Sequence, residues 1–114
     1  MVTRSGHIPE RGDIVWVDFS PQRGHEQANR RPAVVISPRL YNAKAGLALV
    51  CPITSQAKGY PFEVPLQTTG TEGVVLVDQM RSVDWRARRA TFIEHTNPDV
   101  LHMIQERVVQ LVIE

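Results

Sequence analysis

The sequence predicts a mainly β domain with some helix: a small, curled antiparallel barrel of five or six short strands and one C-terminal helix. Short apolar or alternating runs recur between loops rich in Gly, Pro and polar residues, as in antiparallel sheets. The apolar period becomes helical only near the end. The 114 residues are enough for one core, so we expect a single domain over residues 1–114, with residues 1–10 as a loose leader.

The expected strands are short. The first, Asp13–Phe19, alternates and places Val15, Val17 and Phe19 on one face, which predicts a half-buried strand. Residues 39–46 are expected to form one helical turn that ends at Gly46. The remaining strands are expected at Pro32–Ser37, Leu47–Thr54, Tyr60–Leu66, Gly73–Ser82 and Arg88–His95.

The start of the C-terminal helix is marked by Asn97-Pro98-Asp99, which supplies an N-cap, a proline at the first helical position and an acid in the first turn. Apolar residues then recur at helical spacing and should form one stripe that packs on the sheet. They are Val100, Leu101, Ile104, Val108 and Leu111.

The composition is that of an ordinary globular protein, with 42% hydrophobic and 22% charged residues. No apolar stretch approaches the roughly 20 residues of a membrane span, and the N-terminus has no apolar signal region. The single cysteine, Cys51, lies in an apolar run and is expected to be a buried packing residue. These features predict a cytoplasmic protein without a membrane partner.

The net charge is only +1, but the positive charge is concentrated in two segments. Segregated charge gives a local positive potential that predicts an anionic ligand; a solvated basic surface is an equally good reading of charge alone. Arg23, Arg30, Arg31, Arg39 and Lys44 fall in the first segment, and Arg81, Arg86, Arg88 and Arg89 in the second.

The loop before the second strand, residues 24–31, gathers an imidazole, a carboxylate, two amides and two guanidinium groups. It is more varied than a connecting turn, and loops on a rigid sheet often carry functional groups. Arg31 precedes Pro32, which favours an extended backbone there.

Strand alternation places other polar residues. Pro52 predicts that Thr54 lies at a sheet rim, because proline within strands is confined to edges and bulges. Gln79 and Arg81 should project to one side and Asp78 to the other. We therefore expect four side chains to converge on one rim: Arg31, Thr54, Gln79 and Arg81.

Motifs for metal, nucleotide or serine-hydrolase chemistry are lacking, so no metal and no cofactor are expected. The remaining guanidinium, hydroxyl and amide groups suit cleavage of RNA, which brings its own nucleophile. The 2′-hydroxyl attacks the adjacent phosphorus, while the protein orients it and stabilises the developing negative charge.

Nearly the whole chain resembles the MazF/PemK/Kid family of bacterial toxins. The shared motifs include Gly24-His25-Glu26-Gln27, Arg31-Pro32-Ala33-Val34-Val35, Pro52-Ile53-Thr54, Lys58-Gly59-Tyr60-Pro61-Phe62 and Asp78-Gln79 with Arg81-Ser82. The resemblance implies an SH3-like barrel, a homodimer, and metal-independent cleavage of single-stranded mRNA to 2′,3′-cyclic phosphate and 5′-hydroxyl ends. It also implies an antitoxin with an acidic, disordered tail, and binding of any operator DNA only as the toxin–antitoxin complex.

Carried over by residue, the resemblance makes Arg31 and Thr54 catalytic, with Glu26 as a weaker catalytic candidate. One departure is Leu76, because the Kid-like branch has an arginine there. The remaining candidates bind RNA: His25, Gln27, Lys58, Gln79, Arg81, Arg86 and Arg88.

Each assignment has a structural alternative. Arg31 could pair with Glu26, Thr54 could simply favour a strand, and Gln79 could bond backbone. The identities of the general base and the general acid stay open. Two other functions compete: a gyrase-poisoning toxin of the same fold, and an SH3-like RNA-binding module without chemistry.

Overall fold

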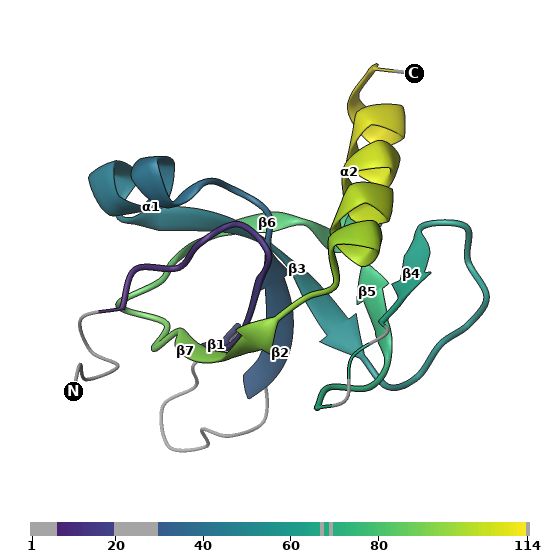
Figure 1. Cartoon of the computed structure of the whole chain (residues 1–114), viewed down its shortest axis with the longest axis horizontal. Helices are drawn as coiled ribbons and strands as arrows, with labels where there is room; N and C mark the ends of the chain where they lie inside the picture. The colour runs from purple at the N-terminus through teal and green to yellow at the C-terminus, as the bar shows by residue number, and fades with distance from the viewer. Residues whose placement is uncertain (1–6, 20–29, 67, 69, 114) are drawn as a thin grey trace.

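A computed structural model of the chain describes residues 7–19, 30–66, 68 and 70–113. In this part of the chain, seven antiparallel strands form one curled sheet, with α1 (Arg39–Ala45) at one side and α2 (Pro98–Ile113) standing against the other (Figure 1). The strands are β1 (Asp13–Asp18), β2 (Arg30–Val35), β3 (Leu47–Thr54), β4 (Glu63–Pro65), β5 (Val74–Leu76), β6 (Arg81–Asp84) and β7 (Thr91–His95).

Strand β3 is central. It pairs with β2 along one side, while on the other side Leu47–Val50 pairs with β6 and its last two residues pair with β5. Pro52 lies at this change of partner, where neither β5 nor β6 is paired with it. The expectation that proline marks a sheet edge is therefore wrong for β3, because the partner change accommodates the missing N–H within a central strand.

Both faces of the sheet are covered, each by its own apolar cluster. One cluster includes Ile14, Val34 and Cys51 together with Val100 and Ile104 of α2. The other is built around Val15, Val17, Ala33, Val35, Val50 and Trp85. The predicted buried face of β1, with Val15 and Val17, is confirmed. The start of β1 is buried on both faces rather than on one, because α2 packs on Ile14 from the other face.

The predicted strand Gly73–Ser82 is divided in three. The short 3-10 helix η3 (Val77–Gln79) separates β5 from β6 and turns the chain from one partner segment of β3 to the other. Two further strands are shorter than expected: β4 covers only the centre of Tyr60–Leu66, and β7 begins after a turn in which Arg89 has a φ of 54°.

The helix ends follow the sequence signals. Gly46 has a left-handed φ of 72° and ends α1, which is longer than the single turn expected. At the start of α2 the backbone N–H of Asp99 donates to Asn97 Oδ1 (2.7 Å). The predicted apolar stripe packs at Val100 and Ile104, but Leu111 is 42% exposed because the end of α2 extends beyond the sheet (Figure 1).

The described end of the predicted leader is packed rather than loose. Pro9 is buried, and its carbonyl accepts a hydrogen bond from Asn42 Nδ2 (2.9 Å). The buried carboxylate of Asp13 accepts the Glu10 N–H (2.9 Å) and lies 3.1 Å from His7 Nε2. Within the described residues, no helix has the length and apolarity to cross a membrane.

Candidate active site

The residue that links the polar surface hollows of the sheet is Thr54, at the end of β3. It lines two of them together with Gln56, so the two hollows meet at this strand end. The first has a volume of about 370 Å³ and the second about 210 Å³. Thr54 and Gln56 are the residues that the two hollows share, and the two hollows together are named the groove around Thr54.

The first hollow brings Arg31 and Thr54 together. The β2–β3 ladder runs from Val35 opposite Val50 to Ala33 opposite Pro52, and Arg31 and Thr54 each lie two residues beyond its last pair. Both residues line this hollow, as the sequence predicted for these two; Arg30, Pro32, Ile53, Ser55, Gln56 and Glu72 complete the lining.

The second hollow corrects the prediction for Asp78. Asp78 and Gln79 both line it, although strand alternation predicted that they face opposite ways. The prediction is wrong because these residues belong to η3, where successive side chains do not alternate. Leu76 also lines this hollow, at the position of the Kid-like arginine; the other residues are Thr54, Gln56, Lys58, Tyr60 and Glu63.

The hydroxyl of Thr54 is oriented by backbone contacts. Its Oγ1 accepts the N–H of Gln56 (3.1 Å), so the hydroxyl hydrogen can donate to another acceptor. Behind Thr54 lies Gly73, whose φ is 125°. A Cβ on Gly73 would lie 2.3 Å from the Thr54 carbonyl oxygen, so only glycine allows this close approach.

The loop that carries Lys58 is held by a carboxylate that sequence reasoning missed. Glu63 accepts the backbone N–H groups of Lys58 (3.0 Å to Oε2) and Gly59 (2.9 Å to Oε1). Gly59 has a φ of 81°. The only sequence signal of this arrangement is the position of an acid, Glu63, four residues after Gly59 and five after Lys58. That signal is weak. The contacts fix the backbone at the rim of the second hollow.

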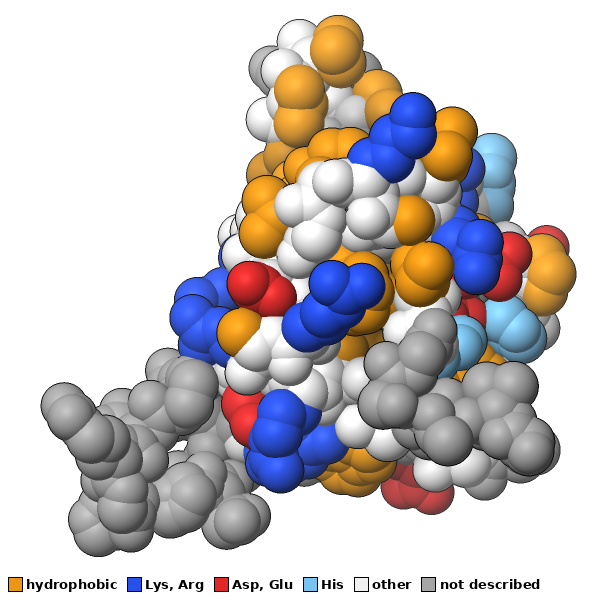
Figure 2. Space-filling model, turned by 90° about the vertical axis from the view of Figure 1, so that its left-hand side faces the viewer, with side chains coloured by type: hydrophobic (Ala, Val, Ile, Leu, Met, Phe, Trp, Pro, Cys, Tyr) orange, Lys and Arg blue, Asp and Glu red, His pale blue; other side chains and the backbone are white. Residues whose placement is uncertain are grey.

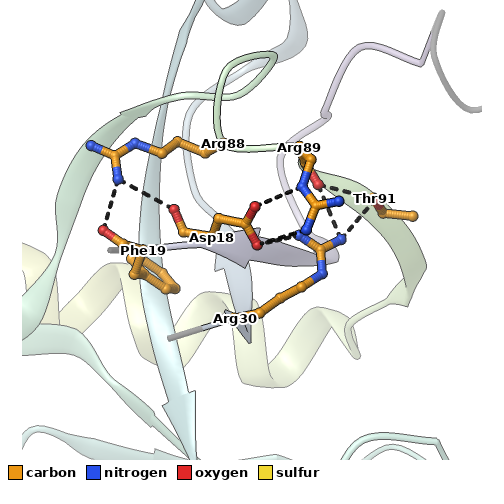
Figure 3. A network of polar contacts seen from close by, with 6 residues as sticks. All are labelled: Asp18, Phe19, Arg30, Arg88, Arg89 and Thr91. Atoms are coloured by element: carbon orange, nitrogen blue, oxygen red, sulfur yellow. Dashed lines mark hydrogen bonds and ion pairs between the residues drawn. The ribbon is translucent and has the colours of Figure 1, made fainter. Parts of the chain in front are cut away.

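A network around Asp18 joins the end of β1 to the start of β2 (Figure 3). Arg30 Nη1 donates to Asp18 Oδ1 (2.7 Å), and Arg89 Nε donates to Asp18 Oδ2 (2.7 Å). The hydrogen bond from Arg89, with the bond and charge of Arg30, holds the pKa of Asp18 below its usual range despite partial burial. Arg88 Nη1 donates to the carbonyl of Phe19 (2.8 Å). The loop candidates His25, Glu26 and Gln27 lie outside the described residues.

The other predicted RNA-binding arginines lie away from Thr54. Arg81 does not line either hollow; its guanidinium lies 5.5 Å from the ring centre of Phe19. Arg86 stacks on Trp85 at 4.7 Å and is exposed, whereas Arg88 is engaged with backbone carbonyls. On the face shown in Figure 2, basic side chains are interspersed with apolar and uncharged ones rather than gathered into one patch.

In the described part of the chain, neither a metal site nor the cysteine thiol provides an alternative catalytic group. It contains no cluster of three or more His, Cys, Asp or Glu side chains that could hold a metal ion. Burial, with a smaller effect of the Asp78 charge, raises the pKa of the Cys51 thiol to about 12. Cys51 is therefore a packing residue, as predicted, and not a nucleophile.

Comparison with known proteins identifies the relatives of this chain. Residues 10–112 match the model of the PemK-like, MazF-like toxins of type II toxin–antitoxin systems. The chain belongs to this family. The family predicted from the motifs is thereby confirmed, and so is the antiparallel β fold with a C-terminal helix.

Individual relatives agree in length and fold. The chain is 48% identical over 112 residues to the endoribonuclease toxin MazF of Escherichia coli K12, covering 98% of this chain and 99% of that protein. It is 35% identical over 104 residues to the Escherichia coli endoribonuclease PemK, covering 87% and 78%. A crystal structure of MazE–MazF from Deinococcus radiodurans matches with a TM-score of 0.86 and 50% identity, covering 93% and 96%.

Proposed function

We propose that this toxin is a sequence-specific, metal-independent endoribonuclease that cleaves single-stranded mRNA by attack of the 2′-hydroxyl. The products are a 2′,3′-cyclic phosphate and a 5′-hydroxyl end. The observation that carries the proposal is the pairing of Arg31 with Thr54 in one hollow of a family member whose relatives are named endoribonucleases. The family and the relatives' names support the activity; the reaction course rests on the chemistry of the hollow.

The two side chains supply complementary contacts to a phosphodiester. Arg31 is exposed at the rim and can place its planar guanidinium against two phosphate oxygens. The hydroxyl of Thr54, held by the Gln56 N–H, donates to an oxygen on the same phosphorus. Both contacts strengthen as charge accumulates in the transition state, so they lower the barrier more than they strengthen substrate binding.

The second hollow extends this site along the RNA. Gln79 and Lys58 line its wall within reach of nucleotides next to the scissile phosphate. An amide can hydrogen bond to a base edge, whereas a lysine contacts phosphate without reading sequence. Single-stranded RNA is the expected substrate, because base edges are largely hidden in an A-form duplex.

An antitoxin is the expected protein partner, because the similar Deinococcus radiodurans toxin is observed with MazE. We propose that a disordered acidic tail of the antitoxin occupies the groove around Thr54 and competes with RNA, and that any operator DNA is bound only by the complex. A cytoplasmic location fits an mRNA substrate and the unpaired Cys51.

A homodimer is proposed with the end of α2 as one contact. This end stands above the sheet in Figure 1 and carries apolar side chains that the described chain leaves exposed. Val112 is 67% exposed and Ile113 is 74% exposed. A second copy would remove this surface from water, as homodimer interfaces do.

The alternatives predict different behaviour. A gyrase poison or a plain RNA-binding module needs no guanidinium beside a hydroxyl at one strand end. The deciding experiment incubates purified toxin with a long single-stranded RNA in EDTA, and in parallel with the same RNA carrying one deoxyribose at a mapped cleavage site. We expect cleavage in EDTA and none at the deoxyribose. Uncut RNA, or cleavage at the deoxyribose, would refute the proposed reaction.

A further inference from the structure

One carboxylate lies in the hollow that holds Arg31 and Thr54. It belongs to Glu72, which the sequence motifs did not single out. Glu72 lies two residues before Val74, which is opposite Thr54 in the β3–β5 ladder. The shared hollow therefore places this carboxylate near the end of β3, together with the proposed catalytic pair.

The backbone on both sides of Glu72 is held in place. Before it, Thr71 Oγ1 donates to Glu94 Oε2 of β7 (2.8 Å), and the Thr71 N–H donates to Thr68 Oγ1 (3.0 Å). After it, the Gly73 carbonyl accepts the N–H of Leu66 (3.0 Å). These contacts fix the backbone on both sides of Glu72, and its exposed side chain is accessible to a substrate in the hollow.

The proposed reaction requires a group that takes the proton of the 2′-hydroxyl. Arginine has no acceptor and stays charged, and an unperturbed threonine hydroxyl is a poor base. Of the described residues that line the first hollow, Glu72 is the one with a carboxylate. Its charged neighbours in that hollow are Arg30 and Arg31 of β2, while Glu94 of β7 reaches the segment through Thr71.

We propose that Glu72 is the general base of RNA cleavage, an assignment that rests on the proposed function. Its carboxylate takes the proton of the 2′-hydroxyl as the 2′-oxygen forms a bond to phosphorus. The bond from phosphorus to the 5′-oxygen breaks, and the leaving oxygen takes a proton from water. The hydroxide so formed then removes the proton from Glu72, which restores the carboxylate.

The test is the pH dependence of kcat/KM for Glu72→Gln against wild type. Losing a positioned general base lowers rates by roughly 10²- to 10⁴-fold. We expect such a loss, together with disappearance of the acidic limb of the profile, while the Kd for a deoxyribose-blocked RNA stays within about threefold. Glu106→Gln, which removes an exposed carboxylate on α2, should match wild type in all three measurements.

Two further variants separate a reacting carboxylate from a structural one. Glu72→Asp should recover part of the rate and keep the acidic limb, because the carboxylate is retained. Thr71→Val, which removes the bond to Glu94, should lower kcat several-fold and also keep the limb, because Glu94 acts only through positioning.

The contrary results are distinct. The assignment is overturned if the acidic limb of the pH profile persists in Glu72→Gln. It is also overturned if Glu26→Gln loses this limb while the pH profile of Glu72→Gln matches that of wild type. These results leave the proposed function standing as long as wild type cuts RNA in EDTA and Arg31→Ala cuts it roughly 10²-fold more slowly or worse. Failure of wild type to cut would instead overturn the proposed function together with this assignment.

Discussion

Asp18 at the end of β1 and Arg30 at the start of β2 form an ion pair of 2.7 Å that joins the two strand ends on either side of the intervening loop. Arg89 binds the other oxygen of the same carboxylate at 2.7 Å, and its backbone carbonyl accepts a bond from Arg30 Nη2 (3.2 Å). The strand ends that flank the loop are therefore tied to the turn before β7. One small carboxylate thus couples three segments that are distant in sequence.

Asp18→Asn should destabilise the fold. The substitution keeps the shape but removes the charge between two guanidinium groups, and Asp18 is only 15% exposed. We expect a loss of about 1–2 kcal/mol in the free energy of unfolding, between the values for surface and buried pairs. Urea denaturation measures it, with Asp99→Asn on the exposed first turn of α2 as the control, which should cost less than about 1 kcal/mol.

The same pair predicts a pH dependence. The pKa of Asp18 in the folded protein lies below its ordinary value of 3.8, so the contribution of this carboxylate to the free energy of unfolding is fully present above pH 3.8. As the pH falls below about 3.8 and through the lowered folded pKa, the contribution is lost. The stability difference between wild type and Asp18→Asn should therefore be constant from pH 5 to 7 and shrink below pH 4. A difference that stays constant to pH 2 would contradict this assignment.

Gly73→Ala should disturb Thr54. The added Cβ would lie 2.3 Å from the Thr54 carbonyl oxygen, at a φ of 125° that side chains rarely adopt. We expect a loss of about 2 kcal/mol or more and slower RNA cleavage. Gly46→Ala is the matched control: its φ is 72°, but a Cβ there meets nothing within 4 Å, so the expected cost is about 1 kcal/mol with unchanged cleavage. Equal effects of the two variants would refute the role of the close approach.

Cys51 should resist thiol reagents in the folded protein. Its side chain is fully buried and its pKa is raised to about 12, so little thiolate exists at pH 8. Labelling with a maleimide or a disulfide reagent should be at least about 100-fold slower in buffer than in denaturant. Labelling at the free-thiol rate without denaturant would show that the core around Cys51 opens readily.

Arg31→Ala and Thr54→Ala should each impair cleavage while leaving the fold intact. Loss of a charge contact to the transition state lowers the rate by roughly 10²-fold or more for Arg31. The reduction should appear in kcat, since both contacts strengthen at the transition state. Arg39→Ala, an exposed arginine at the start of α1, provides the control for lost charge. Wild-type rates in both site variants would show that the site is misplaced.

Arg86 and Arg88 should behave differently, although the sequence suggested one basic surface. Arg86 is exposed and available to phosphate, so Arg86→Ser should reduce the salt slope of RNA binding by about 1 without loss of stability. Arg88→Ser should lower stability by about 1–2 kcal/mol, because it leaves the Phe19 carbonyl unpaired. If the salt slope of RNA binding is unchanged in Arg86→Ser, the Arg86 guanidinium contacts only solvent and Trp85 and does not bind phosphate.

Local patterns predicted most of the regular elements, although β2 spans Arg30–Val35 rather than the predicted Pro32–Ser37. Strand β3 was predicted with its observed bounds, and the start of α2 and the end of α1 follow from their capping residues. These features depend on a few neighbouring residues, so the sequence states them directly. The predicted convergence of four side chains is met in part, because Arg31 shares one hollow with Thr54 and Gln79 shares the other, whereas Arg81 lines neither.

Alternation failed where the chain leaves the strand conformation. Nothing in the apolar run Gly73–Leu76 announces that the next three residues form η3, so Asp78 was assigned to the wrong side. Likewise, the end of α2 continues an apolar pattern beyond the sheet that covers its first half.

What the sequence determined by itself was the fold class, the family and the residues at strand ends, because periodicity, caps and motifs are local properties. The tertiary structure alone decided which polar groups share a site: Glu72 beside Arg31, Glu63 on the Lys58 loop, and Asp18 between Arg30 and Arg89. These groupings depend on register and chain reversal across many residues, and a carboxylate looks the same in sequence whether it faces water, a backbone amide or a guanidinium.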